Sequence, residues 1–432
     1  TINQANGNVG IGIAPNVKLQ VWDTGGGNVA SFSNGVNADL DINLTGGVTT
    51  LTPTTGILAF GTSSTERIRI NAAGDIYNVP QTNTYASTYF GINTGNQLVS
   101  TGAYNTGFGY EVLENNTAGE KNTAMGSQAL FNNTTAGRNT AIGYKALFNL
   151  NNVNSDHVAV GYSAGEDITS GERNTFIGSL SGKLTTTGSY NTAIGYGSYQ
   201  GYPGYANTGN DNTAIGYFAM GSNNVSGNDN TAVGIRALMT LNAGANNVAV
   251  GIDALKVNQA GSNCVAIGAN ALKSDTSVEE SVAVGMNALM SQTSGRNHAF
   301  GFHALQDLTT GQYNTAIGGE ALENLTDGNS NIALGAFAGR AETTGSSQIF
   351  IGREAGKSIN HALGGAGENV IIGHAAAINR TVGTENVLIG SLVNYVGVGT
   401  GSNNVVIGRY SGANLTSGSG NTFLGHQTGV AL

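Results

Sequence analysis

Three pairs of neighbouring carboxylates are the residues of this chain that could perform hydrolytic chemistry. The pairs are Asp39 with Asp41, Glu166 with Asp167, and Glu279 with Glu280. Glycoside hydrolysis needs two carboxyl groups that flank one glycosidic bond. All three pairs stand in turn-like stretches, and adjacent side chains on an extended backbone point apart. We therefore expect solvated turns and no catalytic set.

The histidines and the cysteine show no spacing typical of a metal site or a nucleophile. No H-E-x-x-H pattern occurs, although His298 and His303 fall close together. The single cysteine, Cys264, excludes an intrachain disulfide and occupies a turn position. We expect neither a metal nor a cofactor. The remaining histidines are His157, His361, His374 and His426.

The composition indicates a folded, turn-rich β protein. The chain has 432 residues, of which 67 are glycine and 39% are hydrophobic. Hydrophobic residues at regular positions argue against disorder. The net charge of −9 leaves no basic stripe that would follow a phosphate backbone, so no nucleic-acid partner is expected. No run of 18 apolar residues occurs, so no membrane insertion is expected.

The stretch NTAIG recurs along the chain, and its final glycine serves as the reference for alignment. Nineteen copies occur, and twelve of the eighteen spacings are 17 residues. Such a unit is too short for a helical repeat, but it fits one coil of a β-solenoid with two short strands and two turns. We predict an all-β fold, a parallel β-solenoid of about 19 rungs. The reference glycines are Gly109, Gly126, Gly143, Gly161, Gly178, Gly195, Gly216, Gly234, Gly251, Gly268, Gly285, Gly301, Gly318, Gly335, Gly352, Gly373, Gly390, Gly408 and Gly425.

The first position of the repeat is asparagine in fifteen of the nineteen copies, for example Asn139 and Asn314. Asparagine tolerates left-handed backbone angles and hydrogen-bonds nearby backbone, so we place it at a turn. Stacked rungs would bring these side chains into a ladder.

Positions three and four are never polar, as in Ala141-Ile142 and Ala316-Ile317, which precede Gly143 and Gly318. Neighbouring strand residues face opposite sides, so this strand must be covered on both sides. We expect isoleucine to fill the lumen of the coil and alanine to contact another copy of the chain. A closed ring of identical solenoids, a homo-oligomer, would provide that cover.

An Ala-Leu pair follows most reference glycines, but some rungs have Ala-Gly or Ser-Gly, as at Ala164-Gly165 and Ser411-Gly412. Glycine has the greater conformational freedom. We therefore expect a tighter turn in those rungs.

The 17-residue register begins near residue 102, and residues 102–432 form the predicted solenoid. Residues 1–80 contain alternating, strand-like stretches such as VGIGIAPNVKLQVWD and ERIRINAAGDIYN, typical of a smaller β-rich connector region. Residues 81–101 are the predicted junction.

Two insertions lengthen the 17-residue spacing to 21. Insertions in solenoids map to surface loops that often bind partners. The first contains four tyrosines, whose rings suit sugars and protein surfaces alike. The second covers residues 353–369. The candidate binding residues are Tyr196, Tyr199, Tyr202 and Tyr205 in the first insertion and Asn360 and His361 in the second.

Two stretches resemble known fibre proteins. The run GNVGIGIAPNVKLQV, followed by FGTSSTERIRINAAGDI, is similar to segments of bacteriophage tail fibres and related virion fibres. The NTAIGxxAL rungs resemble repeats of such fibres and, more distantly, the NSVAIG-type repeats of trimeric autotransporter adhesin heads. The resemblance implies a homotrimeric, extracellular virion fibre that attaches to a host-surface glycan or protein and contacts other tail or baseplate proteins.

Two alternatives remain beside a non-enzymatic virion fibre. The first is a bacterial trimeric surface adhesin, which genome context would distinguish. The second is a glycan-hydrolysing tailspike, which would release oligosaccharide from host capsule or lipopolysaccharide.

Overall fold

The computed structural model describes residues 58–62, 65–70, 76–78, 87–95, 102–151, 155–221, 224–274, 276–277, 279–361, 367–380, 383–395 and 399–430. All regular secondary structure in these residues is β-strand. Helices long and apolar enough to cross a membrane are absent from this part of the chain.

Three strands near the N-terminus form a small sheet in the order β1–β2–β3. They are β1 (Leu58–Thr62), β2 (Thr65–Ile70) and β3 (Ile76–Asn78). The strand-like stretch expected at residues 9–23 lies outside the described residues, as do Asp39 and Asp41.

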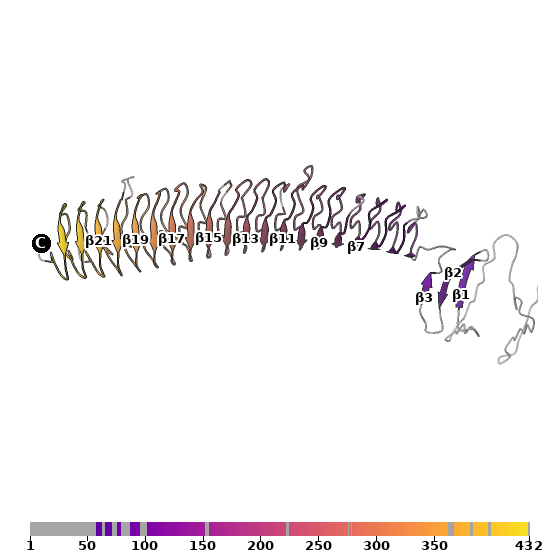
Figure 1. Cartoon of the computed structure of the whole chain (residues 1–432), viewed down its shortest axis with the longest axis horizontal. Coiled ribbons are helices and arrows are strands. Elements are labelled where there is room, and N and C mark those ends of the chain that lie inside the picture. Colours follow the sequence, from indigo (N-terminus) through magenta and orange to yellow (C-terminus); the bar gives the residue numbers. More distant parts are fainter. Residues whose placement is uncertain are drawn as a thin grey trace, which may run out of the picture. The chain divides into compact units, whose positions relative to one another are not determined.

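The repeats form a parallel β-solenoid with a 17-residue period, which confirms the predicted architecture. Twenty three-residue strands stack along one side of the solenoid, each paired in register with the next (Figure 1). At roughly 4.8 Å per rung they span about 90 Å. The strands are β4 (Thr88–Phe90), β5 (Thr106–Phe108), β6 (Thr123–Met125), β7 (Thr140–Ile142), β8 (Val158–Val160), β9 (Thr175–Ile177), β10 (Thr192–Ile194), β11 (Thr213–Ile215), β12 (Thr231–Val233), β13 (Val248–Val250), β14 (Val265–Ile267), β15 (Val282–Val284), β16 (His298–Phe300), β17 (Thr315–Ile317), β18 (Ile332–Leu334), β19 (Ile349–Ile351), β20 (Val370–Ile372), β21 (Val387–Ile389), β22 (Val405–Ile407) and β23 (Thr422–Leu424).

Each coil contains one regular strand, and the expected second strand is replaced by turns. Lys145 and Leu147 both have φ of +53°, which interrupts the extended backbone after each strand. Backbone hydrogen bonds between rungs nevertheless continue there, since the Leu147 N–H donates to the Ala164 carbonyl at 3.0 Å. The first rung, β4, lies within residues 81–101.

The repeated asparagines form the predicted ladder inside the coil. The Asn139 backbone N–H donates to Oδ1 of Asn122 at 3.0 Å, and Asn139 and Asn314 are both buried. The left-handed residue is the one before the asparagine, as at Arg138 with φ of +61°. The expectation that asparagine itself adopts the left-handed conformation is therefore wrong. The position requires asparagine because its side-chain oxygen accepts a hydrogen bond from a buried backbone N–H of the next rung.

The two faces of the strand are opposite to those predicted. Ala141 and Ala316 are fully buried in the lumen, whereas Ile142 is 36% exposed and Ile317 is 45% exposed. The Ala-Leu pair that follows many reference glycines packs into the same core. In those rungs it leaves room for only a methyl group at position three. Isoleucine therefore points outward, together with the threonine or valine at position two.

Aromatic rings occupy position three only where glycine replaces the leucine of the Ala-Leu pair. A Cβ atom at Gly182 would lie 2.6 Å from the Phe176 ring, and one at Gly165 would lie 3.0 Å from it. Gly182 has φ of +59°, close to the +53° of Leu147, so the turn itself accepts leucine. The glycine provides space for the ring, and the expected tighter turn does not occur.

Candidate interaction surface

One side of the solenoid exposes two adjacent columns of apolar side chains. The first column is position four of each strand, and the second is the residue after the reference glycine. Neighbouring rings stack along the second column, as Tyr144 does on Tyr162 with centroids 5.3 Å apart. We call this surface the apolar face. Between β5 and β17 it has eighteen exposed apolar side chains, which are Phe108, Tyr110, Met125, Ile142, Tyr144, Tyr162, Ile177, Ile194, Tyr196, Tyr217, Ile235, Val250, Ile252, Ile267, Met286, Phe300, Phe302 and Ile317.

The apolar face is too large for the surface of an isolated soluble protein. Eighteen partly exposed side chains of this size present on the order of 1,000 Å² of apolar surface, and contiguous patches beyond a few hundred Å² mark interaction sites. The strand geometry makes this face flat and continuous, because every rung repeats the same outward positions. The arrangement suits a long contact with another rod of the same period.

The second column changes character toward the C-terminus, where small, polar and charged residues replace the aromatic ones. Arg353, His374, Arg409 and His426 are all exposed there. From β5 to β16 the second column is therefore large and apolar except at Ser127, Ser179 and Ala269, and beyond β16 only the first column continues. The residues of the second column in this part are Gly319, Ala336, Arg353, His374, Ser391, Arg409 and His426.

The first insertion brings only some of its tyrosines to the surface. Tyr202 and Tyr205 are 57% and 61% exposed, with ring centroids 6.4 Å apart. Tyr196 belongs to the apolar face and stacks on Tyr217 at 5.7 Å. Tyr199 is fully buried, and its hydroxyl donates to the Gly209 carbonyl at 3.1 Å. Burial also raises the pKa of Tyr199. Tyr199 is therefore a core residue and cannot contact a ligand at the surface.

Buried hydrogen bonds anchor the base of this insertion. Asn207 donates from Nδ2 to the Tyr199 carbonyl at 2.7 Å and accepts the Val225 backbone N–H at 2.8 Å. A parallel bridge joins Asn207 to Thr185. The loop thus presents the pair Tyr202 and Tyr205 on a rigid support.

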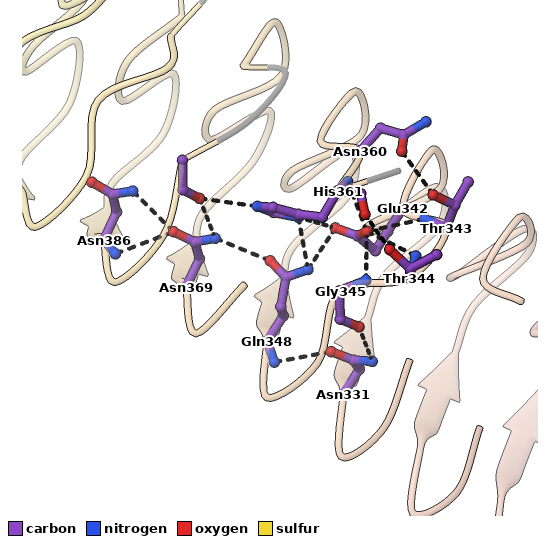
Figure 2. A network of polar contacts seen from close by, with 11 residues as sticks. Asn331, Glu342, Thr343, Thr344, Gly345, Gln348, Asn360, His361, Asn369 and Asn386 are labelled. Carbon is purple, nitrogen blue, oxygen red and sulfur yellow. Dashed lines mark hydrogen bonds and ion pairs between the residues drawn. The ribbon is translucent and has the colours of Figure 1, made fainter. Parts of the chain in front are cut away.

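The candidate residues of the second insertion have structural contacts. Asn360 accepts a hydrogen bond from Oγ1 of Thr343 at 2.8 Å, and His361 is buried (Figure 2). Residues 362–366 lie outside the described part of the chain. His361 is accordingly unavailable to a surface ligand.

His361 forms a buried ion pair with Glu342 (Figure 2). His361 Nδ1 lies 2.6 Å from Glu342 Oε2, and Nε2 lies 3.1 Å from the Gly383 carbonyl. Both neighbours accept hydrogen bonds, so both ring nitrogens donate and the imidazole is charged. Burial alone would lower the pKa of His361, but Glu342 raises it through its hydrogen bond and charge. Burial would raise the pKa of Glu342, but contacts including those from His361 and Gly345 lower it.

His157 is the opposite case, a buried neutral imidazole that replaces the repeat asparagine. Its Nδ1 accepts the Asn174 backbone N–H at 3.1 Å, and its Nε2 donates to the Gly171 carbonyl at 2.9 Å. A charged ring would lose the first of these bonds. Burial lowers the pKa of His157 from 6.5 to about 4.

We expect His157 to make the protein less stable in acid. Between pH 6.5 and about 4 the unfolded chain binds a proton here that the folded chain does not, so stability falls as the pH is lowered through this window. The full loss is about 3 kcal/mol and does not grow below pH 4. Urea unfolding at pH 7.0, 5.5 and 4.0 would measure it.

His157→Asn is the matched control, since it restores the usual ladder residue. The variant should lose this part of the pH dependence. His361 acts in the opposite direction, because its stabilising contribution is complete below pH 6.5 and lost as the pH rises through its raised pKa. Equal pH dependence of the native chain and His157→Asn would show that the assigned protonation of His157 is wrong.

Glu166 and Asp167 do not converge on a cleft. Glu166 lies 3.8 Å from Nζ of Lys145 and 3.5 Å from Nζ of Lys183, while Asp167 accepts from Asn149 Nδ2 at 3.0 Å. These partners hold the two side chains in separate surface contacts. The geometry that glycoside hydrolysis needs is not formed by this pair.

Glu279 and Glu280 line different surface hollows on either side of Arg296. Glu279 borders one of about 260 Å³, and Glu280 borders one of about 420 Å³. Glu280 also pairs with Arg296, at 3.3 Å from Nε. Two carboxylates that face different hollows cannot flank one glycosidic bond.

The remaining candidates are Cys264, His298 and His303. Cys264 is buried and takes the place of a ladder asparagine, where its N–H donates to Oδ1 of Asn247 at 3.0 Å. His303 lies 3.3 Å from Glu323, and His298 is exposed on β16. Across the described ranges, no three His, Cys, Asp or Glu side chains gather as they would around a metal.

No protein-family model matches this chain, and neither a curated protein nor a solved structure is significantly similar to it.

Proposed function

We propose that the protein is a non-enzymatic, homotrimeric virion fibre, a phage tail fibre that attaches the particle to a host surface. The observation that carries this proposal is the apolar face, which runs along the solenoid without cover from the described residues of the chain. The resemblance of the repeats and of the N-terminal stretches to virion fibres supports the assignment to a virion.

The cover that fits this face best is further copies of the same chain in parallel. Parallel copies repeat every rung at the same height, so each exposed apolar side chain of one copy lies level with the same residue of the next copy. Each copy has one apolar face to cover. A closed ring of copies covers the apolar face of every copy and leaves none exposed. The number three comes from the resemblance to trimeric fibres.

The exposed pair Tyr202 and Tyr205 is the proposed contact with the host. Two neighbouring phenol rings provide flat apolar surface and two hydroxyls, which suits sugar rings and protein surfaces. The buried base at Tyr199 and Asn207 lets the pair bind without the entropy cost of ordering a loose loop.

Sedimentation equilibrium tests the assembly. The native chain should have the mass of three chains, and the double variant Ile194→Asp/Ile267→Asp should have the mass of one, because it places charges within the apolar face. Thr187→Asp, on an exposed turn, is the control and should stay trimeric. Adsorption to a panel of bacterial strains is the second readout, and Tyr202→Ala/Tyr205→Ala should lose it as an intact trimer. A native mass of one chain contradicts the fibre.

A further inference from the structure

The surface on the two sides of the first column changes near the same point of the chain. Position two of the strand is threonine in seven of the twelve rungs from β5 to β16, but it is isoleucine or valine in every rung from β18 to β22. The second column loses its large apolar residues over the same rungs. The five residues at position two are Ile332, Ile349, Val370, Val387 and Val405.

Positions two and four of a strand point to the same side of the solenoid, because they are two residues apart. In β18, Ala333 is fully buried, whereas Ile332 on one side of it is 38% exposed and Leu334 on the other is partly exposed. The first column continues as Leu334, Ile351, Ile372, Ile389 and Ile407. We call these two columns from β18 to β22 the C-terminal strip.

The second column is unsuited to an apolar contact in these rungs. The exposed guanidinium of Arg353 has Glu354 at 3.6 Å, and that of Arg409 lies over the Tyr410 ring at 4.7 Å from its centroid. A partner packed on this column would take these cations out of water, which costs more than such loose pairings return. A partner on the C-terminal strip therefore leaves the second column in solvent.

We propose that the contact between copies of this chain moves sideways by one column along the fibre. From β5 to β16 it uses the first and second columns, and from β18 to β22 it uses the first column and position two. The inference rests on the proposed homotrimer, and the partner is the same neighbouring copy throughout. The shift is roughly 6 to 7 Å across the strands, the distance between residues two apart.

Continuity and area both favour a second copy as the partner. The first column belongs to both contacts, and the strands stay in parallel register through the change, with Ala316 paired to Ala333 and Ile332 to Ile349. The ten side chains of the C-terminal strip add on the order of 500 Å² of apolar surface to the apolar face. The sum exceeds the roughly 800 Å² per partner that stable complexes bury.

Cysteine labelling in the full chain tests the shift with two crossed pairs of variants. Thr192→Cys and Ile349→Cys compare position two in the two halves, and Ile235→Cys and Ala336→Cys compare the second column. All four positions are partly exposed in a single chain, so without a partner the four thiols should react alike. Cys264 is buried, so the native chain is the blank.

A maleimide should modify Ile349→Cys and Ile235→Cys roughly tenfold more slowly than Thr192→Cys and Ala336→Cys, because a covered thiol excludes the reagent. Sedimentation equilibrium of each variant before labelling gives its assembly state. Trimers in which Ile349→Cys reacts as fast as Thr192→Cys, or in which Ala336→Cys is protected, overturn the shift and leave the trimer standing. A mass of one chain with four equal rates contradicts the trimer as well.

Discussion

Gly318→Ala should destabilise the solenoid by roughly 4 kcal/mol. Gly318 has φ of +135°, a conformation that alanine adopts only under strain. The new Cβ atom would also lie 2.6 Å from the backbone carbonyl carbon of Gly335 in the next rung. The two rungs would have to separate, and the hydrogen bond from Gly335 N–H to the Ile317 carbonyl, now 2.7 Å, would lengthen.

Gly319→Ala provides a control one residue away. A Cβ atom at Gly319 has no neighbour within 4 Å, so this variant should be as stable as the native chain or slightly more stable. Urea unfolding followed by circular dichroism would compare the two, and hydrogen exchange should show lost protection around β17 and β18 in Gly318→Ala alone. Equal unfolding midpoints for both variants would refute the close-approach argument.

The sequence alone predicted the architecture because each rung repeats the same physical requirements. The constant glycine at 143 and 318 marks the close approach between coils, and the asparagine at 139 and 314 marks the ladder. A period of 17 leaves no room for a helix in the unit. These signals lie within each rung, and their recurrence every 17 residues indicates that the rungs stack.

The same pattern could not predict which face of each strand points into the lumen. Positions three and four are both apolar, so alternation indicates two faces without showing which is inside. The size of the lumen decides, and it depends on the Ala-Leu pair that enters from the turn. Ala141 fits beside Ala146 and Leu147, whereas an isoleucine would not.

The binding residues were predicted only in part, for a similar reason. Four tyrosines three residues apart give no sign that Tyr199 turns inward to satisfy Gly209 while Tyr202 and Tyr205 turn outward.

Phe176 and Gly182 should show strong coupling in a double-mutant cycle. Phe176→Ala empties ring volume from the core and should cost about 4 kcal/mol. Gly182→Leu places a side chain where a Cβ atom already lies 2.6 Å from the ring, and should cost at least as much. The double variant recreates the combination of Ala141 and Leu147, so it should be more stable than either single variant.

The sign of the coupling tests whether the ring and the glycine share one volume in the core. Its size is less informative, because Gly165 leaves part of the volume of the Phe176 ring empty in the double variant. Adding Gly165→Leu should recover further stability, since that leucine also takes a turn conformation used elsewhere. Phe350 lies between Gly339 and Gly356 in the same arrangement, and the same cycle there should have the same sign. Additive losses at both sites would show that the ring and the glycines do not share one volume. Favourable coupling at both sites would mean that the total volume of the core side chains in a rung is what must be conserved. Individual rungs can then differ in their core residues while the outward positions still recur in every rung.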